Sequence, residues 1–196
     1  MAKFILVFVS IFLISISNAQ EKPEGLFINS KAPDFRTNDQ NGIELRLKDV
    51  IKDSLVVLVF YRGQWCPYCN KHLKKLEDSL SMIKEKGARL IAISPEKPEN
   101  IKKTVEKTSA SYSILYDKDM KIMKAYHVAF EVDEKTVSRY KNANIDLLEA
   151  NGQKVNAYLP VPALYIINKE GTIKYRFFEP DYKKRVSVLE VLEQLK

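Results

Sequence analysis

The stretch Phe60-Tyr61-Arg62-Gly63-Gln64-Trp65-Cys66-Pro67-Tyr68-Cys69-Asn70 decides the fold of this chain and contains both of its cysteines. An apolar run with β-branched residues, 54–60, leads into it, and a run with helical spacing follows it. The first run is typical of a strand buried on both faces of a sheet. Two cysteines three residues apart, between such a strand and a helix, are typical of a redox site. The rest of the chain is therefore expected to be the scaffold that holds this turn.

The expected start of a helix at Cys66 and Cys69 favours redox chemistry. Pro67 suits the first helical position, because the N–H that proline lacks has no partner there. Unpaired N–H groups and the positive end of the helix dipole stabilise a thiolate, which lowers the pKa of a cysteine. Two sulfurs on one helical turn can also bond to each other, so the site can cycle between dithiol and disulfide. A purely structural disulfide is disfavoured, since closing so short a loop removes little chain entropy.

The first 19 residues have the pattern of a secretory signal peptide. Lys3 supplies a positive start, residues 4–16 are mostly apolar, and Ser17-Asn18-Ala19 form a small-residue cleavage site before Gln20. The apolar run is shorter than the roughly 20 residues of a membrane span. We therefore expect export to the periplasm or the outside of the cell, without stable membrane insertion once the signal is cleaved. Such a compartment permits disulfide bonds.

The formal charge of the chain is +7, and it becomes +6 when the segment carrying Lys3 is removed. The basic clusters are short, as in Lys71, Lys74 and Lys75 or in the run 183–185. We interpret them as a solvated surface that favours solubility. Nucleic-acid binding would need a basic stripe with a recognisable motif, so no nucleic-acid partner is expected.

Strand and helix patterns alternate along residues 20–196, which predicts one α/β domain with a mixed central sheet flanked by helices. Asn41-Gly42 predicts a hairpin turn, followed by one helical turn at 47–51. Strands are predicted at 54–60, 89–93, 112–116, 163–167 and 172–178, the last two antiparallel. Helices are predicted from the cysteines to Gly87, at 98–107, at 120–126, within an inserted segment at 131–148, and at the C-terminus with Val186, Leu189, Leu192 and Leu195 on its buried face.

Three motifs carry a family resemblance: Ala32-Pro33-Asp34-Phe35, the stretch 60–69, and Val161-Pro162-Ala163-Leu164-Tyr165-Ile166-Ile167-Asn168-Lys169-Glu170-Gly171. Together they resemble the peroxiredoxin-like branch of the thioredoxin superfamily, the alkyl hydroperoxide reductase/thiol-specific antioxidant proteins. The resemblance covers nearly all of residues 26–195. It implies a thioredoxin-like fold, redox chemistry on cysteine without a bound cofactor, and reduction by thioredoxin or a similar thiol.

The resemblance also implies roles by position, with departures. Cys69 matches the peroxidatic cysteine of the family, whereas Cys66 stands where peroxiredoxins have Thr or Ser. Arg62 stands where they have Pro, and Pro162 replaces their active-site arginine. Pro162 instead resembles the cis-proline that faces the disulfide in thioredoxins. The buried carboxylate of thioredoxins matches Phe60, so that proton acceptor is expected to be missing.

Two mechanisms compete. In the first, the Cys69 thiolate attacks a peroxide and becomes a sulfenic acid, Cys66 condenses with it to a disulfide, and Arg62 stabilises charge on the peroxide oxygens. In the second, Cys66 attacks a protein disulfide and Cys69 resolves the mixed disulfide. The departures favour the second mechanism and the overall resemblance favours the first. We expect reduction of hydrogen peroxide and organic hydroperoxides, with periplasmic thiol–disulfide exchange as the alternative.

A third, non-enzymatic hypothesis is a copper- or zinc-binding protein, with Cys66, Cys69, His72 and His127 as ligands. Ligand spacing alone does not make a metal site. We therefore interpret His72 as an exposed polar residue of the helix and His127 as structural, and we predict no metal.

Several aromatic and basic residues are less informative. Tyr61, Trp65 and Tyr68 are expected to line a substrate face around the sulfurs or to pack the loop. Tyr140 is interpreted as filling the core or the surface. Nothing in the sequence places Arg139 at the site.

Overall fold

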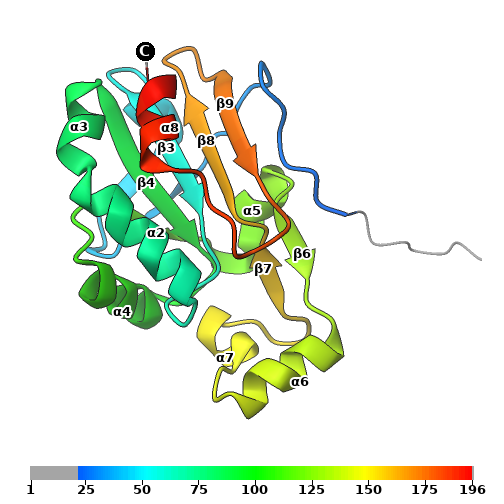
Figure 1. Cartoon of the computed structure of the whole chain (residues 1–196). Helices are drawn as coiled ribbons and strands as arrows, with labels where there is room; N and C mark the ends of the chain where they lie inside the picture. The colour runs from blue at the N-terminus through cyan, green and yellow to red at the C-terminus, as the bar shows by residue number, and fades with distance from the viewer. Residues whose placement is uncertain (1–21, 196) are drawn as a thin grey trace, which may run out of the picture.

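A five-stranded mixed sheet organises residues 22–195, the part of the chain that the computed structural model describes (Figure 1). The predicted signal peptide lies outside the described residues. The strand order is β5-β4-β3-β8-β9. The strands are β3 Leu55–Phe60, β4 Ala88–Ser94, β5 Ser113–Tyr116, β8 Ala163–Ile167 and β9 Ile173–Phe178. β3, β4 and β5 are parallel, and β8 and β9 run antiparallel to their neighbours. All five predicted strands are present, and the fold class is the predicted one.

β3 is the central strand and is buried on both sides, as its continuous apolar run predicts. Successive side chains of a strand point to opposite faces. Val57 and Val59 accordingly join one apolar core, and Val56 and Leu58 join the other. Because both faces of β3 are fixed by packing, the loop that follows Phe60 leaves the sheet from a rigid position.

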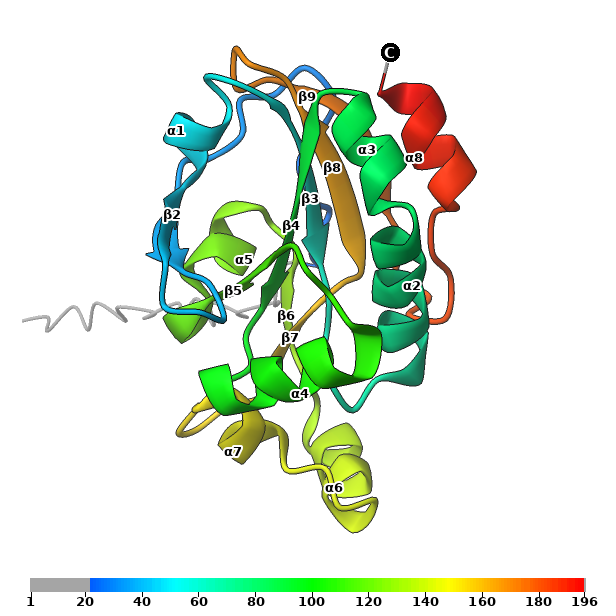
Figure 2. The ribbon, with the colours of Figure 1, turned by 90° about the vertical axis from the view of Figure 1, so that its left-hand side faces the viewer.

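Helices cover both faces of the sheet (Figure 2). The face that carries the cysteines packs against α2 Pro67–Asp78, α3 Leu80–Glu85, α4 Pro98–Thr108 and α8 Val188–Gln194. The opposite face packs against the hairpin of β1 Arg36–Asn38 and β2 Glu44–Arg46, then α1 Leu47–Val50, a 3-10 turn at Lys118–Met120, and α5 Lys121–Ala125. The predicted hairpin turn at Asn41-Gly42 connects β1 to β2 in antiparallel register.

Two helix predictions need correction. The single helix expected after the cysteines is two helices, since Ser79 leaves helical geometry at φ −111° and ψ 11°. In the C-terminal helix, Leu189 is 68% exposed rather than buried. Ser187 caps α8 by accepting a hydrogen bond from the N–H of Glu190. This cap sets the helical phase so that Val191, with Leu195 four residues later, faces the sheet.

The predicted inserted segment contains two helices, α6 Glu134–Asn142 and α7 Leu147–Asn151. It is enclosed by two short strands that were not predicted, β6 Ala129–Glu131 and β7 Tyr158–Pro160, which pair antiparallel. The insertion has a small apolar core of its own, against which Trp65 of the cysteine loop packs. The insertion is therefore held beside the cysteines, at the end of the sheet seen lowest in Figure 1. Between residues 22 and 195, no helix has the length and apolar character to cross a membrane.

Candidate active site

β3 and α2 place the cysteine pair as the sequence predicts. Cys66 is the N-cap residue of α2, with extended backbone geometry at φ −88° and ψ 108°, and Pro67 occupies the first turn. The N–H of Cys69 donates to the Sγ atom of Cys66 at 3.4 Å. This contact satisfies one of the N–H groups that a helix start leaves unpaired.

The two sulfur atoms of Cys66 and Cys69 lie 2.7 Å apart and are not joined by a disulfide. Both residues are only 1% exposed. The pair is thus close enough to form a disulfide after oxidation, but neither sulfur lies open on the surface.

The groups around the pair stabilise the negative charge on Cys69 rather than on Cys66. Burial opposes ionisation of Cys69, but a hydrogen bond from Cys66 and the charge of Arg185 outweigh it and lower the Cys69 pKa to about 6. The Nη2 atom of Arg185 lies 3.2 Å from the sulfur of Cys69, and the main-chain N–H of Arg62 also faces that sulfur. Conversely, the hydrogen bond to Cys69, together with burial, raises the pKa of Cys66. The reduced pair at neutral pH is therefore a Cys69 thiolate beside a Cys66 thiol.

Arg62 is 5% exposed, and aromatic rings hold its guanidinium group. Its carbon Cζ lies 4.9 Å from the ring centre of Trp65 and 4.5 Å from that of Tyr182. Its Nη2 donates a hydrogen bond to the hydroxyl group of Tyr140, on α6. The insertion thus supplies Tyr140 to the site, whereas the sequence analysis interpreted this residue as core or surface filling.

Arg185 is a site residue that the sequence analysis missed. It belongs to residues 179–187, the loop between β9 and α8, here called the C-terminal strap. Lys183 and Lys184 of the strap are exposed, as predicted for a solvated cluster, but Arg185 is half-buried against Cys69. Tyr182 of the same strap stacks on Arg62. Arg185 lies 116 residues from Cys69 in the sequence, so no local pattern could have shown this pairing.

A buried carboxylate lies beside the cysteine loop, although the entering strand β3 ends in Phe60 and supplies none, as expected. Glu96 follows β4 and is fully buried. Its Oε2 accepts a hydrogen bond from the N–H of Gln64 at 2.7 Å, and its Oε1 has no partner among the described residues. Burial and the negative charge of Cys69 raise the pKa of Glu96 to about 8, against the hydrogen bond from Gln64.

Gly63 is required where the cysteine loop passes Glu96. A Cβ atom at Gly63 would lie 2.6 Å from Nε1 of Trp65 and 2.7 Å from Oε1 of Glu96. Real Cβ contacts are not this short, so any larger residue would displace one of these two groups.

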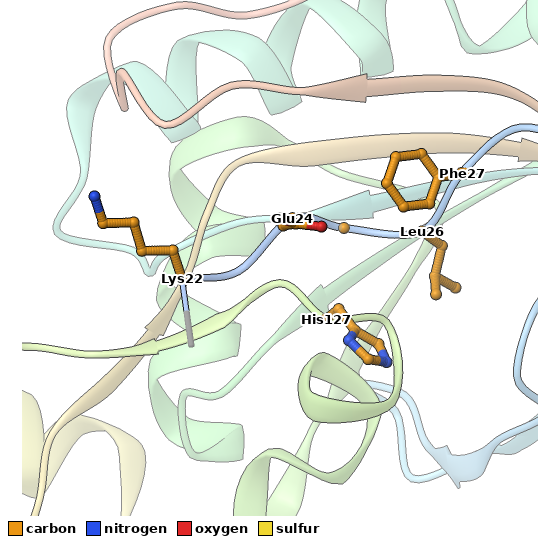
Figure 3. A pocket seen from close by; sticks show the side chains of 6 residues that line it. Lys22, Glu24, Leu26, Phe27 and His127 are labelled. Carbon is orange, nitrogen blue, oxygen red and sulfur yellow. The ribbon is translucent and has the colours of Figure 1, made fainter. Parts of the chain in front are cut away.

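His72 is buried and not exposed as predicted, at 6% exposure. Burial and the nearby charge of Arg185 lower its pKa to about 4, so the imidazole is neutral. His127 lies elsewhere, beside Leu26 and Phe27 of the N-terminal segment, in a cavity of about 470 Å³ (Figure 3). The proposed set of two cysteines and two histidines is therefore not assembled, and residues 22–195 contain no other cluster of typical metal ligands.

Pro162, the residue expected to face the cysteine pair, does not have the expected backbone geometry. Pro162 is buried and follows a trans peptide bond, unlike the cis-proline that the resemblance implies. The trans form of a peptide bond before proline is the favoured one.

The aromatic and basic residues named in the sequence lie in different places. Tyr61 is in the core, and its hydroxyl group donates a hydrogen bond to the hydroxyl oxygen of Thr104. Tyr68 is 40% exposed and meets Tyr182 edge to face. Arg139 lines a cavity of about 450 Å³ beside Arg62 and Tyr140.

Comparisons with known proteins agree with this geometry. The model of the AhpC/TSA family matches residues 28–176. The chain is 31% identical over 103 residues to a protein named peroxiredoxin bcp from Helicobacter pylori, across 53% of this chain and 67% of that protein. It is 32% identical over 106 residues to the thiol-disulfide oxidoreductase ResA from Bacillus cereus, across 54% of this chain and 60% of ResA.

Solved structures are similar in fold. Peroxidoxin BcpB from Mycobacterium tuberculosis matches with a TM-score of 0.65 at 19% identity, covering 86% of this chain and 95% of that chain. A cysteine-to-serine mutant of peroxiredoxin 6 from Arenicola marina matches with a TM-score of 0.70 at 18% identity, covering 87% of this chain and 72% of that chain. At these identities the similarity establishes the fold alone.

Proposed function

Because the chain belongs to the AhpC/TSA family of thiol-dependent oxidoreductases, we propose that it reduces hydrogen peroxide and organic hydroperoxides, with Cys69 as the attacking residue. The observation that carries the proposal is the position of the charge. The Cys69 sulfur faces the Arg185 guanidinium at 3.2 Å, and its lowered pKa of about 6 makes it a thiolate at neutral pH. The thiolate is the form of cysteine that attacks a peroxide.

The first step forms one bond and breaks one bond. The Cys69 thiolate attacks the terminal oxygen of the hydroperoxide, a sulfur–oxygen bond forms, and the oxygen–oxygen bond breaks. The product is Cys69 sulfenic acid and an alkoxide, which takes up a proton and leaves as an alcohol. Arg185 stabilises the negative charge as it moves from sulfur to oxygen. Arg185 here takes the role predicted for Arg62, while Arg62 supplies the main-chain N–H that faces the sulfur.

The second step closes the disulfide. The Cys66 sulfur attacks the sulfenic sulfur of Cys69, and the hydroxyl group leaves as water. The 2.7 Å separation between the sulfurs means that this step needs no large rearrangement. The thiol proton of Cys66 must leave during the attack. Glu96 is the buried carboxylate on this side of the sheet, and a pKa of about 8 suits a group that takes up and releases protons near neutral pH.

Disulfide exchange on folded proteins is the second candidate, and the similarity to ResA favours it. That reaction requires an exposed Cys66 thiolate as the attacking group. In this structure the pKa of Cys66 is raised and that of Cys69 is lowered, so the thiolate is at Cys69. The negative charge thus lies on the sulfur that would attack a peroxide and not on the one that would attack a protein disulfide, which is why we place peroxide reduction first.

The cycle needs an external reductant, and we propose a thioredoxin-like thiol. It would attack the sulfur of Cys66, because Cys69, with the lower pKa, is the better leaving group. The signal-peptide pattern of residues 1–19 supports a site of action in the periplasm or outside the cell. Mass spectrometry of the exported protein should find Gln20 at its N-terminus, and a chain that retains Met1 in the cytoplasm would refute the proposed location.

Stopped-flow oxidation of the reduced protein by hydrogen peroxide tests the function. Trp65 is the single tryptophan and lies in the cysteine loop, so its fluorescence reports the reaction. The wild type should react orders of magnitude faster than free cysteine. Cys69→Ser should abolish the reaction, whereas Cys66→Ser should keep the first turnover and accumulate sulfenic acid. A wild-type rate equal to that of free cysteine, together with insulin reduction that depends on Cys66, would replace this function with disulfide exchange.

A further inference from the structure

A cavity of about 450 Å³, here called the insertion cavity, lies between the cysteine loop and the inserted segment. Its volume is in the range of sites for small organic ligands. Its lining comes from three distant parts of the chain: Arg62 of the cysteine loop, several residues of the insertion, and Tyr182 of the C-terminal strap. Neither Cys66 nor Cys69 lines it, so a molecule bound there would not meet the sulfur atoms.

Part of the lining of the insertion cavity is apolar. Val132 and Leu159 belong to the small core of the insertion, where they are 5% and 0% exposed. Phe130 and Ile145 pack against the same core and add partly buried apolar surface to the cavity. Because removal of apolar surface from water is favourable, this lining favours a ligand with a carbon chain.

Arg62 brings a buried positive charge to the insertion cavity. The residue is 5% exposed, and its guanidinium group stacks on the rings of Trp65 and Tyr182. Its Nη2 atom donates to Tyr140, but its Nε atom is buried and has no hydrogen-bond partner among the described residues. None of the ion pairs formed among residues 22–195 includes Arg62. Since buried charges and buried N–H groups normally have partners, the cavity is suited to an anion.

The other charged groups of the insertion cavity set the charge of this anion. Arg139 on α6 and Asp133, the N-cap residue of that helix, also line the cavity. A hydrogen bond from Thr136 lowers the pKa of Asp133, with a smaller contribution from the charge of Arg139, so this carboxylate is ionised at neutral pH. Two positive groups and one negative group leave a net charge that suits a singly charged anion. A carboxylate fits best, because its two oxygens match the planar fork of a guanidinium group.

Arg62 also connects the insertion cavity to the cysteine pair. The hydrogen bond to Cys69 and burial raise the pKa of Cys66, and the charge of Arg62 opposes this rise. A carboxylate bound at Arg62 would offset that charge, so Cys66 would lose its proton less readily. Cys66 must lose this proton when it attacks the sulfenic acid of Cys69. A bound carboxylate would therefore slow closure of the disulfide without blocking the first step.

We propose that the insertion cavity binds short-chain aliphatic carboxylates and that the bound acid slows closure of the disulfide. The carboxylate is bound by Arg62 and Arg139. The carbon chain packs against Val132 and Leu159. The acid is neither oxidised nor reduced, so the site itself is independent of the redox reaction. The effect on closure rests on the proposed function.

Titration of the reduced protein with hexanoate at constant ionic strength tests the site. The ring centre of Trp65, the single tryptophan, lies 4.9 Å from the Cζ atom of Arg62, so its fluorescence reports a ligand at Arg62. Hexanoate should bind about tenfold more tightly than hexanamide, an uncharged molecule of the same length, as expected for a charge-assisted hydrogen bond. Acetate lacks the carbon chain and should bind at least about tenfold more weakly than hexanoate.

A matched pair of variants on α6 assigns the binding to the insertion cavity. Arg139→Gln should weaken the binding of hexanoate by about fivefold, as for a partly exposed ion pair, and leave hexanamide unchanged. Lys135→Gln removes the same charge from an exposed position that does not line the cavity, and it should bind hexanoate like the wild type. Equal binding of hexanoate and hexanamide by the wild type would overturn the site. Unchanged binding of hexanoate by Arg139→Gln would overturn it as well.

Trapping with dimedone tests the effect on the cysteines. Dimedone reacts with a sulfenic acid and not with a disulfide, so it measures Cys69 sulfenic acid before Cys66 closes the disulfide. After one equivalent of hydrogen peroxide, saturating hexanoate should increase the trapped fraction several-fold, and hexanamide should not. Bound hexanoate that leaves this fraction unchanged would overturn the link to Cys66. A wild type that does not react with hydrogen peroxide would refute the proposed function, while the titration with hexanoate would still decide the site.

Discussion

At the scale of single residues, the structure decides which of two neighbouring sulfurs carries the negative charge. The start of α2 favours a thiolate in the cysteine pair, as the sequence predicts, and the N-cap contact taken alone would favour Cys66. The guanidinium group of Arg185 lies at Cys69 instead, and the thiol of Cys66 becomes the proton donor within the pair. A hydrogen bond within the pair and the charge of a distant side chain thus place the thiolate at Cys69, the residue that the family resemblance matches to the peroxidatic cysteine.

Replacing Arg185 by methionine should raise the pKa of Cys69, since an opposite charge close to a thiolate favours its ionised form. The expected rise of the titration midpoint is roughly one to two pH units. The wild-type rate with hydrogen peroxide should increase with pH through about 6 and stay constant above. The variant should still be increasing at pH 8. Absorbance of the thiolate at 240 nm and stopped-flow rates measure both changes.

Lys184→Ala serves as the control for this titration, because Lys184 is an exposed neighbour whose ammonium group faces Glu179 at 3.6 Å. This substitution should leave the midpoint of the Cys69 titration unchanged. An unchanged midpoint in Arg185→Met would contradict the assignment of the thiolate to the Arg185 contact.

At the scale of elements, the C-terminal strap connects the redox site to the last helix. Arg185 contacts Cys69, and Tyr182 contacts both Arg62 and Tyr68. In the reduced protein the strap is held by a charge-assisted hydrogen bond, which is about twice as strong as a neutral one. Oxidation to the disulfide removes the negative charge from Cys69, so Arg185 loses this partner.

The strap should therefore be cleaved faster by trypsin in the oxidised protein than in the reduced one. Loss of a charge-assisted hydrogen bond of about 1.5 kcal/mol corresponds to roughly tenfold more opening. Cleavage after residues 183–185 would be followed by mass spectrometry, after the reductant has been removed. The double variant Cys66→Ser with Cys69→Ser cannot form the disulfide, so trypsin should cleave it at the same rate after oxidising and after reducing treatment. Slower cleavage of the oxidised wild type would rule out a strap held by the thiolate.

At the scale of the whole molecule, the site forms where three parts of the fold meet. The sheet supplies the cysteine loop and Glu96, the insertion supplies Tyr140, and the strap supplies Arg185. Trp65 packs against both the main core and the small core of the insertion. Stability and redox chemistry are therefore coupled through buried ionisable groups, above all Glu96.

Glu96→Gln should change the pH dependence of unfolding. The folded pKa of about 8 is above the ordinary value of 4.5, so the stabilising contribution of Glu96 is complete below 4.5 and is lost as pH rises through 8. Glutamine does not ionise, so its contribution to stability does not change with pH. Its amide oxygen can still accept the hydrogen bond from the main-chain N–H of Gln64. The free energy of unfolding of the reduced variant, relative to that of the wild type, should therefore increase by about 3 kcal/mol between pH 5 and pH 8.

Urea unfolding of the reduced proteins at both pH values measures this difference. Glu85→Gln, an exposed position on α3, provides the control and should follow the wild type. If the free energy of unfolding changed by the same amount between the two pH values in the wild type and in Glu96→Gln, Glu96 would not be a buried acid with a raised pKa in solution.

The sequence by itself determined the sheet, the position of the cysteine pair and the start of α2. These features depend on contacts between near neighbours: the apolar run of β3, the Asn41-Gly42 turn, and Pro67 in the first turn. Periodicity and turn chemistry report such contacts directly.

Only the tertiary structure decided the chemistry of the pair. Arg185, Glu96 and Tyr140 come from elements far from Cys69 in the sequence, and each is an ordinary polar residue in its own local pattern. His72 looked exposed for the same reason, because the strap that buries it begins more than a hundred residues later. Charge and burial act through space, so the ionisation of a sulfur depends on which distant side chains the fold brings within a few ångströms of it.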